Sequence, residues 1–161
     1  MKIRLQNGGF AARRKSASGF SLIELLIVVA IILIIAAIAI PNFLRAKMAA
    51  NESSAVSSIH SVNTAEIQYA SAYPSVGFST TLANLGPAGA SYIDAILAGG
   101  SKSGYIFTYV QNATDTPSDG YTINADPVTR GVTGLRSFYS DQQNVTHYNQ
   151  TAAASTTDPQ L

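Results

Sequence analysis

An apolar stretch of membrane length with one carboxylate near its start constrains this chain more than any other feature. Residues 20–40 are almost all isoleucine, leucine, valine and alanine, with Glu24 as the only charged side chain and Pro41 directly after them. A helix rising about 1.5 Å per residue makes this stretch about 30 Å long, which matches the hydrocarbon core of a bilayer. A charge there is costly unless it is paired, so Glu24 is a functional candidate.

A basic leader precedes the apolar stretch. Residues 1–19 carry five basic side chains and no acidic one. A positive segment before an apolar one is typical of a secretory signal peptide. Here, however, the apolar run is longer than a usual signal core, and bulky residues follow it in place of a small-residue cleavage site. The small residue Gly19 lies before the run, so cleavage after it would remove the leader and leave Phe20 as the new N-terminus.

The sequence GFSLIELL at residues 19–26, followed by the apolar run and Pro41, resembles the N-terminal signature of bacterial type IV prepilins and the related pseudopilins. The resemblance is close over residues 14 to about 47 and loose beyond them. It implies cleavage after Gly19 by a dedicated inner-membrane prepilin peptidase, which also N-methylates Phe20.

The same resemblance implies an assembly role for Glu24. In a filament core built from identical apolar helices, a carboxylate needs a cation, because removing one member of a buried pair costs about 3–5 kcal/mol. The resemblance suggests the amino group of Phe20 in the neighbouring subunit, so Glu24 would set the axial register of each incoming subunit. The simpler alternative is a polar residue tolerated near a helix end. Pro41 is expected to kink or interrupt the helix, and loosening there would give the subunit extensibility.

The charge distribution predicts that the C-terminal part is exported. The chain has a net charge of +1, but without residues 1–19 five basic and nine acidic side chains remain, a charge of about −4. Basic leaders stay in the cytoplasm. We therefore expect a single-pass inner-membrane protein before assembly and an extracellular pilus filament afterwards. Cysteine is absent, so no disulfide closes the C-terminal region, unlike in many pilins.

The rest of the chain predicts an α+β fold in which a long helix packs on a small antiparallel sheet. Residues 41–73 favour an amphipathic continuation of the helix, and residues 74–161 form the remainder of a globular head. One broad helical face is formed by Val56, Ile59, Val62, Ile67, Tyr69, Ala70 and Tyr73. Asn63 and Glu66 fall on the same side and make the apolar stripe imperfect.

Short elements are expected after the long helix. Residues 80–85 and a segment capped by residues 91–94, which resemble a capping box, predict two brief helices. Period-two alternation then predicts three or four antiparallel strands, at residues 104–110, 121–125, 135–139 and 145–148. Residues 99–104 suggest a flexible connection, and the polar tail 151–161 is expected to be mobile.

No catalytic, cofactor or metal site is expected. His60 and His147 do not have the spacing of a metal pair, and neither a nucleophile elbow nor a phosphate-binding loop occurs. The turn acids Asp115, Asp119 and Asp126 are weak calcium candidates, for which solvated turns are the simpler interpretation.

Nucleic acid is not expected as a main ligand either. Beyond the apolar stretch and the residues just after it, the basic side chains are Lys102, Arg130 and Arg136, and six aspartates oppose them. Phosphate binding needs clustered positive charge.

These observations predict a structural subunit of a type IV pilus and not an enzyme. Its expected partners are further copies of itself in a helical filament, the prepilin peptidase, and an inner-membrane assembly platform with its ATPase, because the chain has no nucleotide site of its own. Three alternatives remain: a pseudopilin of a type II secretion system, a membrane-anchored adhesive or binding module that never polymerises, and a membrane-anchored enzyme.

Overall fold

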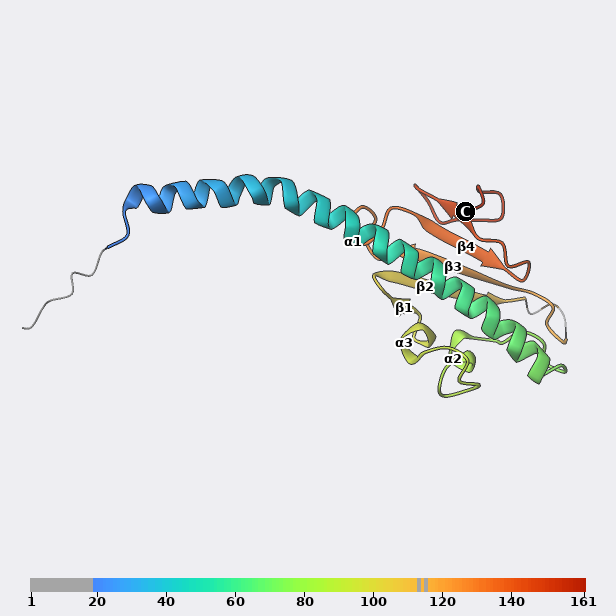
Figure 1. Ribbon diagram of the computed structural model, residues 1–161. Coiled ribbons are helices and arrows are strands. Elements are labelled where there is room, and N and C mark those ends of the chain that lie inside the picture. Colours follow the sequence, from blue (N-terminus) through green and yellow to red (C-terminus); the bar gives the residue numbers. More distant parts are fainter. Residues whose placement is uncertain (1–18, 113, 115) are drawn as a thin grey trace, which may run out of the picture. The chain divides into compact units, whose positions relative to one another are not determined.

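The computed structural model describes residues 19–112, 114 and 116–161. The predicted leader, apart from Gly19, lies outside these residues. The chain divides into two compact units between Ala39 and Ile40. One helix, α1 (Leu22–Ala72), contributes to both (Figure 1).

The long helix is confirmed. It has 51 residues, begins just after the predicted cleavage junction and ends immediately before Tyr73. Pro41 lies inside it, so the helix continues through this position, as the predicted continuation over residues 41–73 requires. Proline removes one amide from the helical ladder, but alanines before it and Leu44 and Ala46 after it have high helix propensity and favour the neighbouring turns.

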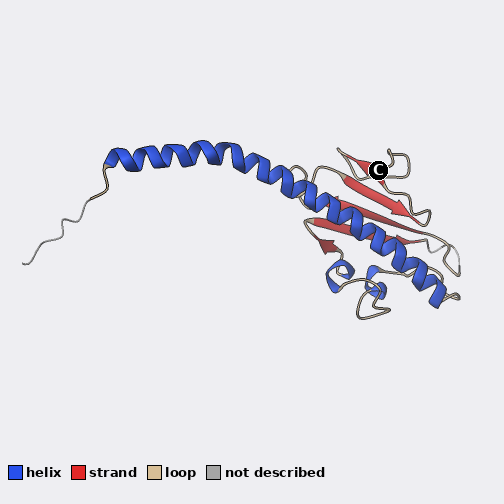
Figure 2. Cartoon of the chain, in the orientation of Figure 1, coloured by secondary structure: helices blue, strands red, loops and turns tan. Residues whose placement is uncertain are grey.

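The second unit contains a five-stranded antiparallel sheet whose strand order follows the sequence. The strands are β1 (Ser101–Lys102), β2 (Tyr105–Gln111), β3 (Tyr121–Pro127), β4 (Ser137–Asp141) and β5 (His147–Asn149). Two short helices, α2 (Leu82–Leu85) and α3 (Ala95–Ala98), precede them. Figures 1 and 2 show the second half of α1 lying across the sheet. The predicted α+β architecture is confirmed.

The core forms between one face of the sheet and the second half of α1. Alternation in β2 turns Tyr105 and Phe107 inward, where they are 0% and 5% exposed, while Ile106 stays 47% exposed on the outer face. The helix contributes small and branched residues, which permit close approach to the sheet. The main members of this cluster are Ala55, Ile59, Val62, Ala65, Leu85, Leu97, Tyr105, Phe107, Ile123 and Phe138.

The segment 99–104, predicted as a flexible connection, instead forms an edge strand and a tight turn. Ser101 pairs with Ile106, and Lys102 pairs with Tyr105. Ser103 and Gly104 adopt positive φ angles of 51° and 74°, which close the hairpin. A two-residue strand is too short to give an alternation pattern, so hydrophobic periodicity could not reveal it.

The brief helix after residue 91 is confirmed, but its cap differs from the expected one. Asp94 is the N-cap residue, and its side chain accepts hydrogen bonds from the amides of Ile96 and Leu97. Ser91 has a φ angle of 59° and lies outside the helix. Aspartate is as good an N-cap as serine, and the chain uses the residue nearer the helix.

The predicted inner face of α1 was partly wrong. Ile67 and Tyr73 are 58% and 45% exposed, whereas Asn63 and Glu66 are 1% and 0% exposed. Asn63 bonds to the hydroxyl groups of Ser140 and Tyr121, at 2.9 Å each. These partners lie on the sheet, so the buried polar groups of Asn63 have hydrogen bonds. The two polar residues that interrupted the predicted apolar face of α1 are therefore part of the core.

The tail 151–161 makes more specific contacts than its composition suggests. The carbonyl of Thr146 accepts a hydrogen bond from the Leu161 amide at 2.9 Å. Ala154 is 5% exposed, and its carbonyl accepts a bond from Asn124 at 2.8 Å. The tail thus lies against β3 and the segment before β5, in a chain that has no disulfide to hold it.

Asp158 is the main side-chain anchor of this tail, and Asp158→Ala is expected to release it. Its carboxylate accepts bonds from Ser155 N (2.7 Å), Ser155 Oγ (2.9 Å) and Asn149 Nδ2 (2.8 Å). Hydrogen exchange of the amides in residues 151–161 should accelerate at least about tenfold, because exchange reports local opening. Asp126→Ala, an aspartate on β3, is the control. Unchanged exchange in Asp158→Ala would contradict this role.

Candidate functional site

The start of α1 holds the residues that the sequence singled out. Phe20 is 73% exposed just before the helix, and the carbonyl of Ser21 accepts the first helical hydrogen bond, from Leu25 at 3.2 Å. Glu24 therefore lies in the first turn. The N-terminal end of a helix carries partial positive charge, which favours a carboxylate at this position.

The apolar part of α1 is open along its length. Between residues 22 and 40, the large hydrophobic side chains are 44–78% exposed. The helix contains an 18-residue window that is long and apolar enough to cross a membrane, and none of that window is buried. Burial would stabilise this surface by roughly 25 cal/mol per Å², so it requires lipid or another protein around it.

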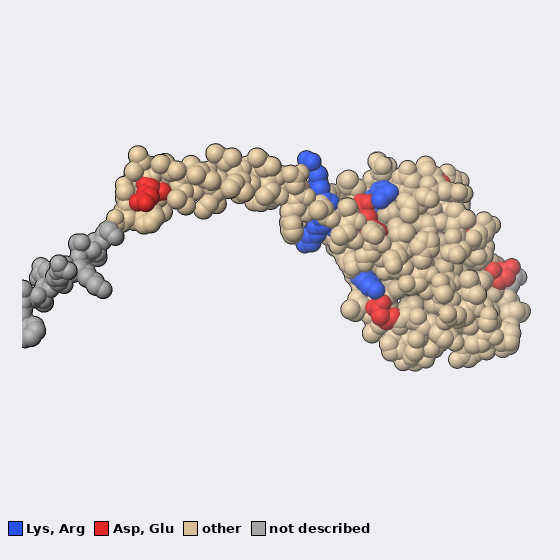
Figure 3. Space-filling model, in the orientation of Figure 1, with Lys and Arg blue, Asp and Glu red and all other residues tan. Residues whose placement is uncertain are grey.

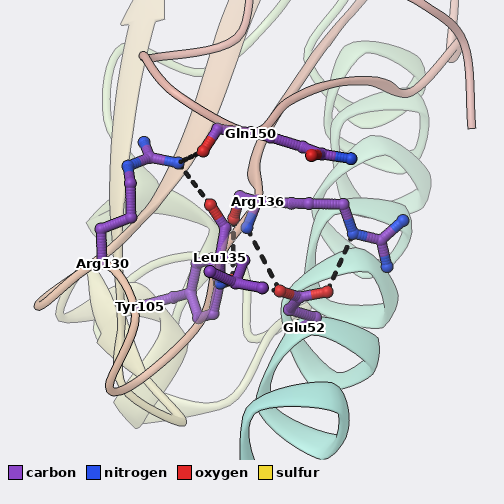
Figure 4. A network of polar contacts seen from close by, with 6 residues as sticks. All are labelled: Glu52, Tyr105, Arg130, Leu135, Arg136 and Gln150. Atoms are coloured by element: carbon purple, nitrogen blue, oxygen red, sulfur yellow. Dashed lines mark hydrogen bonds and ion pairs between the residues drawn. The ribbon is translucent and has the colours of Figure 1, made fainter. Parts of the chain in front are cut away.

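A polar clamp fastens the second half of α1 to the start of β4 (Figure 4). The Glu52 carboxylate accepts hydrogen bonds from the amides of Leu135 and Arg136, at 2.8 and 3.2 Å, and from Arg136 Nε at 2.8 Å. The Arg136 guanidinium also stacks over the rings of Phe138 and Tyr148, at 5.4 and 5.5 Å. Burial raises the pKa of Glu52, but these amides and the guanidinium outweigh it and hold the pKa below its usual range.

Arg130 forms a second polar connection. Its guanidinium donates to the carbonyls of Gln150 and Ala152, at 2.9 and 3.1 Å, and to Ser137 Oγ at 2.7 Å. It also donates to the carbonyl of Leu135, as Figure 4 shows. Five donors in a planar fork suit this task, so Arg130 joins the segment before β4 to the tail.

The remaining residues considered in the sequence show no reactive arrangement. Lys102 pairs with Asp94 at 2.8 Å. His60 is exposed on α1, and His147 Nδ1 lies 2.6 Å from the Asp158 carbonyl oxygen. Within the part of the chain that the structure describes, no group of three or more histidine, cysteine or acidic residues gathers to hold a metal.

The calcium candidates are not brought together in any described site. Asp119 is exposed and Asp126 is half-buried on β3, while Asp115 lies outside the described residues. The three basic residues considered for nucleic acid, Lys102, Arg130 and Arg136, are engaged in the contacts above. Figure 3 shows no continuous basic surface on the visible face.

Sequence reasoning missed the clamp formed by Glu52 and the burial of Glu66. Glu66 accepts bonds from Ser79 N at 2.9 Å and Ser79 Oγ at 2.5 Å. One feature of the sequence could have revealed them: both acids lie on the helix in the same stretch as Ala55, Ile59 and Val62. When an acid falls on the inward face of a helix, either the assigned face is wrong or the acid is buried with hydrogen-bond partners.

The N-terminal segment matches a known family model. Residues 14–40 match the model for the prokaryotic N-terminal methylation motif. In this segment the chain is similar to proteins of the type IV prepilin type. The match covers Gly19, Phe20 and Glu24 together with the whole apolar run, and it ends one residue before Pro41.

A curated relative supports the same assignment. This chain is 60% identical over 38 residues to the type IV wide pilus major component PilA4 of Thermus thermophilus. The aligned stretch covers 24% of this chain and 29% of that relative, so the match spans less than a third of the relative's length. No solved structure matches this chain.

Proposed function

We propose that this chain is a prepilin and a structural subunit of a type IV pilus. The observation that carries the proposal is an apolar helix with its membrane-length window unburied, one carboxylate in its first turn, and a Gly19-Phe20 junction just before it. Before assembly, lipid would cover this helix in a single pass through the inner membrane. In the filament, identical helices would replace the lipid.

The proposed maturation has two steps. The prepilin peptidase hydrolyses the peptide bond after Gly19, which releases the basic leader and frees the amino group of Phe20. The neutral amine then takes one methyl group from a sulfonium methyl donor, which leaves as its thioether. The resulting N-methyl-Phe20 is a secondary amine that is protonated, and so positively charged, at neutral pH. The exposed, non-helical position of Phe20 supports access to this junction.

Assembly would then use the residues at the start of α1. Glu24 of an incoming subunit pairs with the Phe20 amine of a neighbour and so sets the axial register of the filament. Pro41 marks a point in α1 where the helix carries one hydrogen bond fewer and stretches more readily. The energy comes from the assembly platform and its ATPase, and the finished filament is extracellular.

An intact-mass measurement on filaments sheared from the cell surface tests this proposal. The expected species begins at Phe20 and is one methyl group heavier than the unmodified chain. The membrane fraction of the same cells is the comparison. A processed species found only in membranes would instead favour a type II secretion pseudopilin. A chain that retains residues 1–19 in every fraction would overturn the prepilin processing altogether.

A further inference from the structure

The connection between β3 and β4, residues 128–136, exposes three large apolar side chains. Val128, Val132 and Leu135 are 55%, 59% and 51% exposed. Gly131 in this loop has a φ angle of 83°, and a Cβ atom placed there would meet no described atom within 4 Å. The loop thus projects into open space. Three such side chains within eight residues form a patch, and an exposed apolar patch marks a surface that contacts a partner or a membrane.

Hydrogen bonds hold this loop beside the point where α1 enters the head. Asn51 Nδ2 donates to the Thr133 carbonyl at 2.8 Å, and the Glu52 carboxylate accepts from the Leu135 amide at 2.8 Å. Residues 40–51 of α1 have no buried side chain, and burial begins at Glu52. Figure 1 shows the orange connection between β3 and β4 turning beside α1 at this end of the head. The apolar patch therefore lies at the end of the head from which α1 leads back to the apolar run.

The same end of the head carries positive charge that nearby acids do not balance. Residues 40–51 of α1 and the loop 128–136 contain no acid and four basic residues, which are Arg45, Lys47, Arg130 and Arg136. The nearest acids in the sequence are Glu52, which pairs with Arg136, and Asp126, so two positive charges remain. The two basic residues on α1 are exposed, and among the described residues no ion pair within 4 Å is recorded for them. Figure 3 shows basic side chains where α1 enters the head.

The spacing of charges along α1 indicates where the membrane boundary falls. Between Glu24 and Arg45 lie 20 uncharged residues. A helix of that length spans about 30 Å, the thickness of the hydrocarbon core, so Arg45 lies at its boundary. The six residues from Arg45 to Asn51 add about 9 Å, and the headgroup layer is about 5–7 Å thick. The loop therefore lies at the outer edge of the headgroups, and an average helix tilt of about 20° brings one side of the head closer to them.

We propose that the loop 128–136 rests on the bilayer that α1 spans, with Val132 and Leu135 at the headgroup layer and Arg45 and Lys47 on the phosphates of anionic lipids. Basic side chains beside exposed apolar ones are typical of surfaces that bind anionic membranes. The inference rests on the proposed function, because it concerns the membrane stage before assembly. It adds a lipid contact made by the head itself, which holds the head in one orientation until the subunit leaves the bilayer.

Tryptophan fluorescence tests this contact, because the chain has no tryptophan of its own. Val132→Trp places the probe on the loop, and Val110→Trp places it near the far end of β2, at a side chain that is 57% exposed. Each full chain is reconstituted in vesicles of equal parts phosphatidylcholine and phosphatidylglycerol with brominated acyl chains. Bromine quenches a tryptophan only where it meets the lipid, so quenching of Val132→Trp should exceed that of Val110→Trp at least about threefold. Adding Arg45→Gln and Lys47→Gln to Val132→Trp should lower its quenching at least about twofold.

A third probe, Leu33→Trp in the middle of the apolar run, separates the two ways in which the experiment can fail. If Leu33→Trp is quenched but Val132→Trp is quenched no more than Val110→Trp, the loop contact is overturned while the membrane stage of the proposed function stands. If Leu33→Trp is not quenched, α1 does not span the bilayer and the membrane stage itself fails. A Val132→Trp probe that is unquenched in vesicles but shielded from aqueous iodide in sheared filaments would place a second copy on the loop and also overturn the lipid contact.

Discussion

Replacing Glu24 with glutamine is expected to reduce surface filaments at least about a hundredfold. Glutamine keeps the size of the side chain and removes its charge, so in the proposed filament the amine of Phe20 in the neighbouring subunit would be left buried without a partner. Breaking a buried pair in this way costs about 3–5 kcal/mol, and 1.4 kcal/mol corresponds to a factor of ten. The measurement is the amount of chain in the sheared filament fraction relative to the membrane fraction.

The controls separate assembly from processing. Glu24→Asp retains the charge on a shorter side chain and should retain part of the yield. Ser21→Ala alters the same turn without touching a charge and should assemble normally. Intact mass of the Glu24→Gln chain in the membrane should still show cleavage after Gly19. Filaments at the parental level in Glu24→Gln would favour a membrane anchor that does not polymerise through this helix.

Replacing Glu52 with alanine should destabilise the head by about 3–5 kcal/mol, because it leaves two amides and a guanidinium without their shared acceptor. Glu52 is 8% exposed, so water replaces the lost bonds poorly. Glu52→Gln retains one oxygen for the amides and should cost less. The measurement is the thermal unfolding of the full chain in detergent, followed by near-ultraviolet circular dichroism.

The other ion pair of the head provides a matched control. Asp94 and Lys102 are 48% and 32% exposed in their side chains, and pairs of this kind contribute about 1 kcal/mol or less. Asp94→Asn also keeps a good N-cap for α3, so its unfolding temperature should stay close to that of the parent. Equal effects of Glu52→Ala and Asp94→Asn would show that the clamp adds nothing beyond a surface pair.

The same clamp predicts a pH dependence. The pKa of Glu52 is lower in the folded head than the usual glutamate value of about 4.3, because the bonds it accepts outweigh its burial. Its contribution is therefore fully present above that usual value and is lost as the pH falls through the lower, folded value. Unfolding of the parent should become easier in this acidic range, and Glu52→Gln should lack this component.

The elements predicted best from the sequence are those whose pattern lies within one continuous segment. Gly19, the 16 uncharged residues that follow Glu24, and the break at Tyr73-Pro74 mark the long helix without reference to the rest of the chain. Alternation in residues 105–110 likewise predicted β2 because three aromatic residues share one face. Both predictions depend only on neighbours along the chain.

The predictions failed where a residue's partner is distant in sequence. Glu52 finds its partners 83 and 84 positions later, and Asn63 bonds to Ser140, 77 positions later. In a hydrophobic pattern such residues look like interruptions of an apolar face. The pattern contains no information about the hydrogen-bonding groups on the strand that the helix faces. The tail was expected to be mobile for the same reason, since the acceptors for Leu161 and Asn124 appear only once the sheet is formed.

The strand order of the sheet bears on how this head acquires its structure. Every strand pairs with the strand next to it in the sequence, so each new pairing closes a loop of two to nine residues. Short loops cost little chain entropy, and topologies dominated by such local pairings fold fast. Because α1 precedes the sheet in the sequence, the head can add its strands one after another onto a helix that is already present. Residues at the very end, which fasten the tail, then complete the structure last.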